Sequence, residues 1–107
     1  GFLVNEVAAG IKFAFNLTGN LAAIALKGAG FVIGEVADAL KFVFNLEAKL
    51  AAGALKAAGF IASEIGGIIG SLYSLGEEAV GDILEGIGFA ADVICDFIPI
   101  MPFCFLP

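Results

Sequence analysis

Polar side chains in this sequence fall along one side of a helix. On a helical wheel at 100° per residue, the polar residues between positions 30 and 58 occupy an arc of about 120°, and only Glu47 lies outside it. The residues on the arc are Glu35, Asp38, Lys41, Asn45, Lys49 and Lys56. A stripe that keeps its phase over about seven turns predicts one continuous helix of about 25 residues. A turn at Asn16–Asn20 or at Asn45–Lys49 is the other way to divide the sequence, and it would break the stripe.

The stripe recurs because the sequence is built from a repeated unit. Gly-Phe pairs begin the units at positions 1, 30, 59 and 88, and the units 1–29 and 30–58 are identical at 17 of 29 positions without a gap. The third unit, 59–87, has diverged, and the fourth ends near residue 98, before a Pro- and Phe-rich tail at 99–107. A glutamate holds the sixth place of the first three units. We therefore expect a single domain, 1–107, of repeated helical units.

These units predict an all-α fold, an antiparallel hairpin array or bundle of three long helices and a short fourth. The expected helices span about residues 2–27, 31–56, 60–86 and 88–98. Short turns at 28–30 and 57–59 separate the first three helices, and short connections make neighbouring helices antiparallel. Each glycine inside the third helix costs about 1 kcal/mol relative to alanine, so we expect that helix to be kinked, interrupted or packed very closely. Its glycines are Gly66, Gly67, Gly70, Gly76, Gly81 and Gly86.

The apolar surface of such helices is larger than one small domain can bury. Hydrophobic residues make up 61% of the chain and charged residues 15%, whereas about 25% charged residues is typical of globular chains. A polar arc of about 120° leaves about 240° of each helix apolar, although an apolar stripe only somewhat wider than 100° is usual. We therefore expect other copies of the chain, an apolar ligand, an interface or lipid to cover the remainder.

Charge and processing signals narrow the partners and the location. The net charge is −6, and residues 57–107 contain seven carboxylates and no base, which speaks against nucleic acid because its binding needs basic patches. The sequence starts at Gly1 instead of methionine, so we expect that a signal peptide has been removed and that the protein is secreted. Asn16-Leu17-Thr18 is an acceptor triplet that makes Asn16 a candidate for N-glycosylation.

No catalytic constellation is present, so we do not expect an enzyme. The chain has no histidine, which removes Ser-His and Cys-His pairs and the common zinc sites. A cluster of acids late in the third unit offers oxygen atoms to calcium, but a solvated face explains it more simply, and we expect no metal site. These acids are Glu77, Glu78, Asp82 and Glu85.

Cys95 and Cys104 are the only two cysteines in the chain. In an exported protein, a disulfide between them is the favoured interpretation, and it would fold the tail back onto the short fourth helix. A pair of reduced buried thiols, a link between chains and a thioether to a prosthetic group are the alternatives.

The leading functional hypothesis is a secreted protein that binds an apolar small molecule between its helices. A lipid, a fatty acid, a pigment or a similar molecule would fit, and the sequence identifies no other cofactor. The predicted lining is Phe13, Phe15, Phe31, Phe42, Phe44 and Phe60. A homo-oligomer is expected as well, because each helix has more than one apolar flank to cover.

Two other classes of protein fit the same pattern. A membrane-active or pore-forming protein is one, because a 25-residue helix is about 37 Å long and the hydrocarbon core of a bilayer is about 30 Å thick. Against it, the longest run without a charged side chain extends only from Phe13 to Leu26, which is shorter than a spanning segment requires. An interfacial, surfactant-like structural protein is the other alternative.

Overall fold

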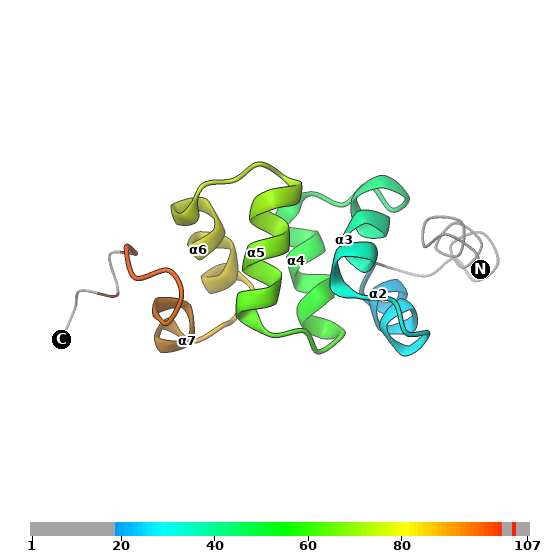
Figure 1. The fold of residues 1–107 in the computed structure, drawn as a ribbon, viewed down its shortest axis with the longest axis horizontal. Helices are drawn as coiled ribbons and strands as arrows, with labels where there is room; N and C mark the ends of the chain where they lie inside the picture. The colour runs from blue at the N-terminus through cyan, green and yellow to red at the C-terminus, as the bar shows by residue number, and fades with distance from the viewer. Residues whose placement is uncertain (1–18, 102–103, 105–107) are drawn as a thin grey trace.

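The computed structural model describes residues 19–101 and residue 104, and within them the chain forms six helices and no strand (Figure 1). The helices are α2 Gly19–Gly28, α3 Ile33–Phe42, α4 Ala48–Ala57, α5 Ala62–Leu72, α6 Glu77–Gly86 and α7 Ala91–Cys95. The all-α fold is therefore confirmed, but the expectation of three long helices is wrong. The predicted helices at 31–56 and 60–86 are each divided into two, and the start of the one at 2–27 lies outside the described residues. The expected fourth helix at 88–98 is reduced to the short α7.

The two long helices are interrupted because one residue in each adopts a left-handed backbone. Asn45 has a φ of 54° between α3 and α4, and Ser74 has a φ of 55° between α5 and α6. A right-handed helix cannot continue through such a residue. The amide of Leu75 donates to the carbonyl oxygen of Gly70 at 2.9 Å, which closes the end of α5. Since Asn45 and Ser74 hold the same place in successive units, the second and third units both divide where the polar stripe argued against a turn.

Replacing Asn45 with alanine tests this division of the repeat by the sign of its effect. We expect Asn45→Ala to lower the free energy of unfolding by about 1 kcal/mol, because the left-handed region costs alanine more than asparagine. In a continuous helix the same change would raise that free energy by about 0.5 kcal/mol, because alanine is the better helix former. Urea denaturation measures the difference. Ser74→Gly is the companion variant, with a gain of about 0.5–1 kcal/mol expected. A higher free energy of unfolding for Asn45→Ala, together with a lower one for Ser74→Gly, would contradict the breaks and favour continuous long helices.

Glycine ends the helices at the other junctions, where the sequence places the turns. Gly30, Gly59 and Gly88 have φ values of 97°, 94° and 103°. The amide of the phenylalanine that follows each glycine donates to a leucine carbonyl five residues back, which is the Schellman arrangement that satisfies the last carbonyls of a helix. These pairs are Phe31 with Leu26, Phe60 with Leu55, and Phe89 with Leu84, at 3.1–3.2 Å. The Gly-Phe pair of the repeat is thus a helix-ending signal.

The glutamates at the sixth place of the second and third units cap the start of the helices that contain them, α3 and α5. The amide of Val32 donates to Oε1 of Glu35 at 3.2 Å, and the amide of Ile61 donates to Oε1 of Glu64 at 3.3 Å. The amides at the start of a helix lack intrahelical acceptors, so these carboxylates satisfy groups that would otherwise need water. The equivalent Glu6 lies outside the described residues.

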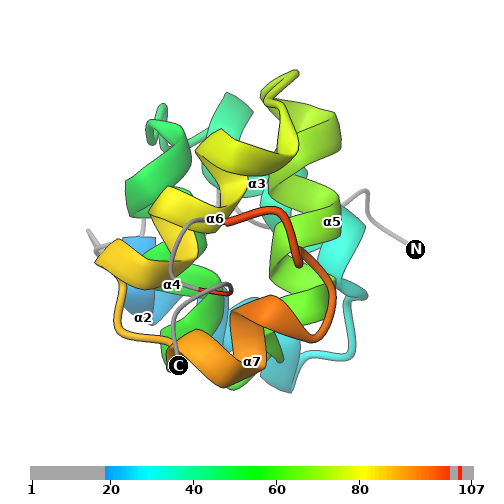
Figure 2. The ribbon, with the colours of Figure 1, turned by 90° about the vertical axis from the view of Figure 1, so that its left-hand side faces the viewer.

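The helices pack in two rows that share one core. α2, α4 and α6 form one row and α3, α5 and α7 the other, and each helix also contacts its sequence neighbours in the opposite row (Figures 1 and 2). The buried positions recur at the same places in successive units. In the first row they are Ala22, Ala23 and Leu26, then Ala51, Ala52 and Leu55, then Val80, Gly81 and Leu84. The buried face of this row is thus the same three-position pattern used three times, with small residues allowing close approach of the helices.

Two lysines of the polar stripe connect the second unit to the third. Nζ of Lys41 donates to the carbonyl of Leu72 at 2.8 Å, and Nζ of Lys56 donates to the carbonyl of Ile87 at 3.0 Å, in both cases 31 residues further along the chain. The same Lys56 ammonium lies 5.2 Å from the centre of the Phe89 ring. Each acceptor lies at the end of a helix, where the carbonyls carry partial negative charge. These lysines therefore act between units instead of facing solvent.

Candidate functional site

A hollow of about 260 Å³ lies along α5, where this helix faces α6 and the segment after α7. From here on, the tail means this segment, which begins at Asp96. Three of its glycines, Gly66, Gly67 and Gly70, come from α5. Apolar side chains and three polar ones complete the lining, namely Leu75, Val80, Phe97 and Ile98 with Ser63, Ser71 and Glu77. The interior is therefore mainly apolar, with hydroxyl groups and one carboxylate as its polar groups.

A second hollow of about 340 Å³ adjoins the first and shares Ser63 and Phe97 with it. The start of α5 and the end of α7 provide the rest of its lining, which is Ile61, Ala62, Val93 and Asp96. We call the two hollows together the α5 groove. Ligand sites in proteins usually measure about 300–1,000 Å³, so the whole groove has the size that one small molecule requires, whereas the first hollow alone falls just short.

The glycines of α5 differ in what surrounds them. A Cβ atom at Gly66 would lie 2.8 Å from Cε2 of Phe97, and one at Gly70 would lie 3.2 Å from Cγ2 of Val80. A Cβ atom at Gly67 would meet nothing within 4 Å. Gly66 and Gly70 therefore allow the walls to approach the helix, while Gly67 leaves the space of the groove open.

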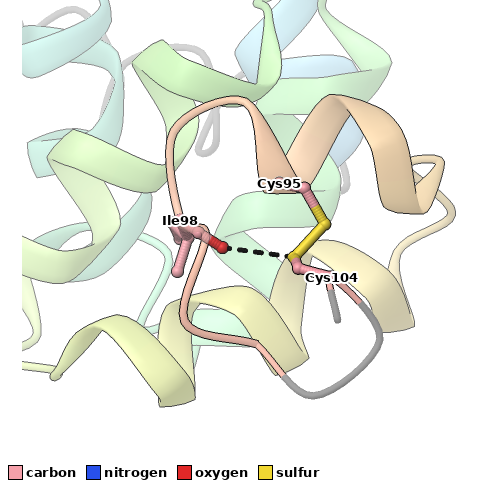
Figure 3. The surroundings of a disulfide bond; sticks show 3 residues. All are labelled: Cys95, Ile98 and Cys104. Atoms are coloured by element: carbon pink, nitrogen blue, oxygen red, sulfur yellow. Dashed lines mark hydrogen bonds between the residues drawn. A yellow bond between two sulfur atoms is a disulfide. The ribbon is translucent and has the colours of Figure 1, made fainter. Parts of the chain in front are cut away.

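The tail that forms one wall of the groove is held by a disulfide between Cys95 and Cys104, whose Cα atoms are 5.6 Å apart (Figure 3). Sγ of Cys104 also lies 3.5 Å from the carbonyl oxygen of Ile98, and this is a sulfur–oxygen contact because a disulfide sulfur carries no hydrogen to donate. Within this loop Ile98 and Met101 are almost completely buried. The disulfide therefore fixes the side chains that close this end of the helical rows.

The glycine excess of the third unit makes room for this tail. Gly66 stands where the second unit has Ala37, and the Phe97 ring lies against it. Gly81 stands where the second unit has Ala52, and a Cβ atom there would lie 2.8 Å from Cε of Met101. Of the outcomes expected for this glycine-rich segment, two are realised, because it is both interrupted and closely packed.

Tyr73 lies at the break between α5 and α6. Its hydroxyl donates to the carbonyl of Leu46 at 2.6 Å, and Nζ of Lys41 lies 4.9 Å from the centre of its ring. Burial raises the pKa of the Tyr73 phenol above its ordinary value of 10.0, because the charged phenolate is poorly solvated there. The neutral Tyr73 side chain thus connects the break between α5 and α6 with the break between α3 and α4.

Alkaline unfolding tests the role of Tyr73. The unfolded chain loses the phenolic proton near pH 10, below the raised pKa of the folded state, so the contribution of Tyr73 is complete below about pH 10 and is lost as the pH rises toward the folded pKa. Tyr73→Phe should remove this part of the pH dependence and cost about 1 kcal/mol near neutrality for the lost hydrogen bond. Since Tyr73 is the only tyrosine, the ultraviolet absorbance of the phenolate follows it directly. Parallel stability curves for both proteins above pH 10 would contradict this role.

The predicted phenylalanine lining does not gather around the α5 groove. Phe31, Phe44 and Phe60 are half-buried against the core, and Phe42 is 60% exposed at the end of α3. Phe13 and Phe15, like the candidate glycosylation site Asn16, lie outside the described residues. None of the four described phenylalanines lines the groove. The role observed for Phe31 and Phe60 is structural, because their amides form the hydrogen bonds that end the preceding helices.

The groove residues were not predicted because the tail was expected only to fold back onto the short fourth helix. Two residue differences between the second and third units mark the position of the groove. Gly67 and Gly70 replace Asp38 and Lys41 of the second unit, so the polar stripe is lost where the groove opens. Loss of a polar stripe next to an aromatic tail is the pattern that could have located the site.

The groove contains few polar side chains. Its polar side chains are two hydroxyls and two carboxylates, Glu77 and Asp96, all on exposed residues. Among residues 19–101 and 104, no group of three or more histidine, cysteine or acidic residues is placed to hold a metal ion. None of the helices in this part of the chain has both the length and the apolarity to cross a membrane.

No protein-family model matches the chain, and comparison with curated proteins and with solved structures finds no similar protein. Its function is therefore argued from its own residues.

Proposed function

We propose that this protein is a secreted binder of small apolar or amphiphilic molecules and that the α5 groove is its binding site. The observation that carries the proposal is an apolar hollow that a helix keeps open with Gly67, a residue whose Cβ position faces empty space. The apolar part of this lining faces water in an open hollow, so an apolar occupant gains free energy by burying apolar surface there. The disulfide that holds one wall supports an exported protein, because such bonds persist in oxidising compartments.

The α5 groove is a better candidate than the other large hollow of the described residues. A space of about 520 Å³ beside α4 is lined by few residues, and half of them are polar or charged: Asn20, Glu47 and Lys49. Ligand pockets are usually lined mainly by apolar side chains with few polar groups. The apolar tail side chains Phe97 and Ile98 give the α5 groove that composition.

Two glycine-to-alanine variants separate the two sites. Gly67→Ala should raise the free energy of unfolding by about 0.5–1 kcal/mol, because alanine favours the helix and its methyl group meets no neighbour. The same methyl group should lower the affinity for octanol several-fold, because it occupies the α5 groove. Gly53→Ala is the matched control, since Gly53 is also inside a helix and lines the hollow beside α4.

Calorimetric titration with octanol, below the concentration at which it separates from water, measures both affinities. We expect Gly53→Ala to bind octanol like the unsubstituted protein and Gly67→Ala to bind it less tightly. A protein that binds no octanol, or variants in which only Gly53→Ala weakens binding, would contradict the proposed site.

An interfacial protein is the second candidate, because large apolar side chains are exposed at matching positions of the repeat. Val32 and Ile61, which hold the same place in successive units, are 64% and 60% exposed, and Leu50 is 56% exposed. Such side chains could contact membranes, an air–water interface or further copies of the chain in a homo-oligomer. Tensiometry separates this candidate from a ligand binder, since an interfacial protein should lower the surface tension at micromolar concentration and lose its tertiary contacts as it does so.

A further inference from the structure

We infer that the α5 groove selects amphiphiles with a positively charged head group and disfavours fatty-acid carboxylates. This inference rests on the proposed function, because it assigns the head group of the molecule that the groove binds. The occupant is a single-chain amphiphile with an ammonium group, whose chain lies along α5.

The charged residues of the groove all have the same sign. Glu77 is the only charged residue in the lining of the hollow that faces α6, and Asp96 is the only one in the lining of the adjoining hollow. The head group of an amphiphile in either orientation therefore meets a carboxylate. Residues 57–107, which supply the entire lining, contain no lysine or arginine that could pair with an anionic head group.

Two positively charged features lie near the groove, but the carboxylates contribute more to the local charge. The start of α6 has a helix dipole equivalent to about half a positive charge, but Glu77 and Glu78 place two negative charges in the same turn. Lys41 reaches the end of α5, but its ammonium is bonded to the carbonyl of Leu72 and its side chain does not line either hollow. The local charge at the groove is therefore negative.

The hydroxyl groups at the groove suit the same ligand. Ser63 and Ser71 lie on α5 on the same side as the glycines, and both side chains are exposed. A hydroxyl oxygen accepts hydrogen bonds from an ammonium N–H, and a nearby carboxylate strengthens the binding of that cation. The apolar lining residues Val80 and Phe97 contact the chain of the amphiphile, so one molecule satisfies both the polar and the apolar parts of the groove.

Three probes with the same chain test the head group, namely octylammonium, octanol and octanoate. Calorimetric titration of the full chain at low ionic strength, below micelle-forming concentrations, gives three affinities. We expect octylammonium to bind about tenfold more tightly than octanoate, with octanol between them, and the ratio to fall as salt is added because exposed charges are screened.

Glu77→Gln assigns the effect to the groove. It should reduce the ratio between octylammonium and octanoate to about threefold, since Asp96 and the more distant acids remain. Glu85→Gln is the matched control, because Glu85 is an exposed acid on the same helix that lines neither hollow, and it should leave the ratio unchanged.

The outcomes separate this inference from the proposed function. Binding of octanol together with octanoate at least as tight as octylammonium, or equal effects of Glu77→Gln and Glu85→Gln, would overturn the inference and leave the binding function standing. If octanol does not bind, the proposed function itself fails, whatever the charged probes do.

Discussion

Replacing Leu55 with alanine is expected to lower the free energy of unfolding by about 3–5 kcal/mol. Leu55 is completely buried in α4, the helix that contacts α2, α3, α5 and α6. Its carbonyl also accepts the hydrogen bond from Phe60 that ends the helix. Removing the side chain loses its transfer free energy and leaves a cavity where helices of both rows meet. Urea denaturation followed by circular dichroism measures this loss.

Leu50→Ala is the matched control for this substitution. Leu50 lies in the same helix and has the same side chain, but it is 56% exposed. We expect a loss below about 1 kcal/mol, because alanine favours the helix slightly and little apolar surface is buried there. Losses of similar size for the two variants would show that α4 is not oriented as described, whereas a large difference supports the two-row packing.

Removing the disulfide with the double substitution Cys95→Ala and Cys104→Ala is expected to cost about 2.5–3 kcal/mol, the entropy of closing a loop whose ends are nine residues apart. The loss should extend to ligand binding, because the tail residues Phe97 and Ile98 form a wall of the α5 groove. Thermal unfolding and octanol titration of the same sample measure both effects.

A reducing agent is the control for the double variant. Reduction should destabilise the unsubstituted protein by a similar amount and leave the variant unchanged, because the variant has no disulfide to reduce. Octanol affinity that survives in the variant would show that the tail is not part of the binding site, even if stability falls as expected.

The repeat and the helical fold could be predicted from the sequence because both depend on local patterns. The Gly-Phe pairs mark real helix ends, since a positive φ at Gly30 or Gly59 depends on the local chain. The division of each unit at Asn45 and Ser74 was not predicted, because periodicity cannot distinguish a lysine that faces solvent from one that bonds the next unit. Lys41 keeps the helical phase of the stripe although it is half-buried and bonded to Leu72.

The groove could not be predicted because it depends on contacts between distant parts of the chain. Gly66 and Phe97 are far apart in the sequence, and the missing side chain at Gly66 matters only once the tail folds back against it. Within the helix alone, the glycines of the third unit are a cost to stability. Their tertiary role outweighs that cost, since they allow Phe97 and Met101 to pack against helix backbones.

The most direct test of the account is to locate bound octanol by nuclear Overhauser effects between its chain and the protein. The account expects contacts from the octyl chain to Gly67, Val80 and Ile98, which line the α5 groove. Contacts confined to exposed side chains outside that hollow, such as Val32 and Leu50, would contradict it and favour an interfacial protein instead.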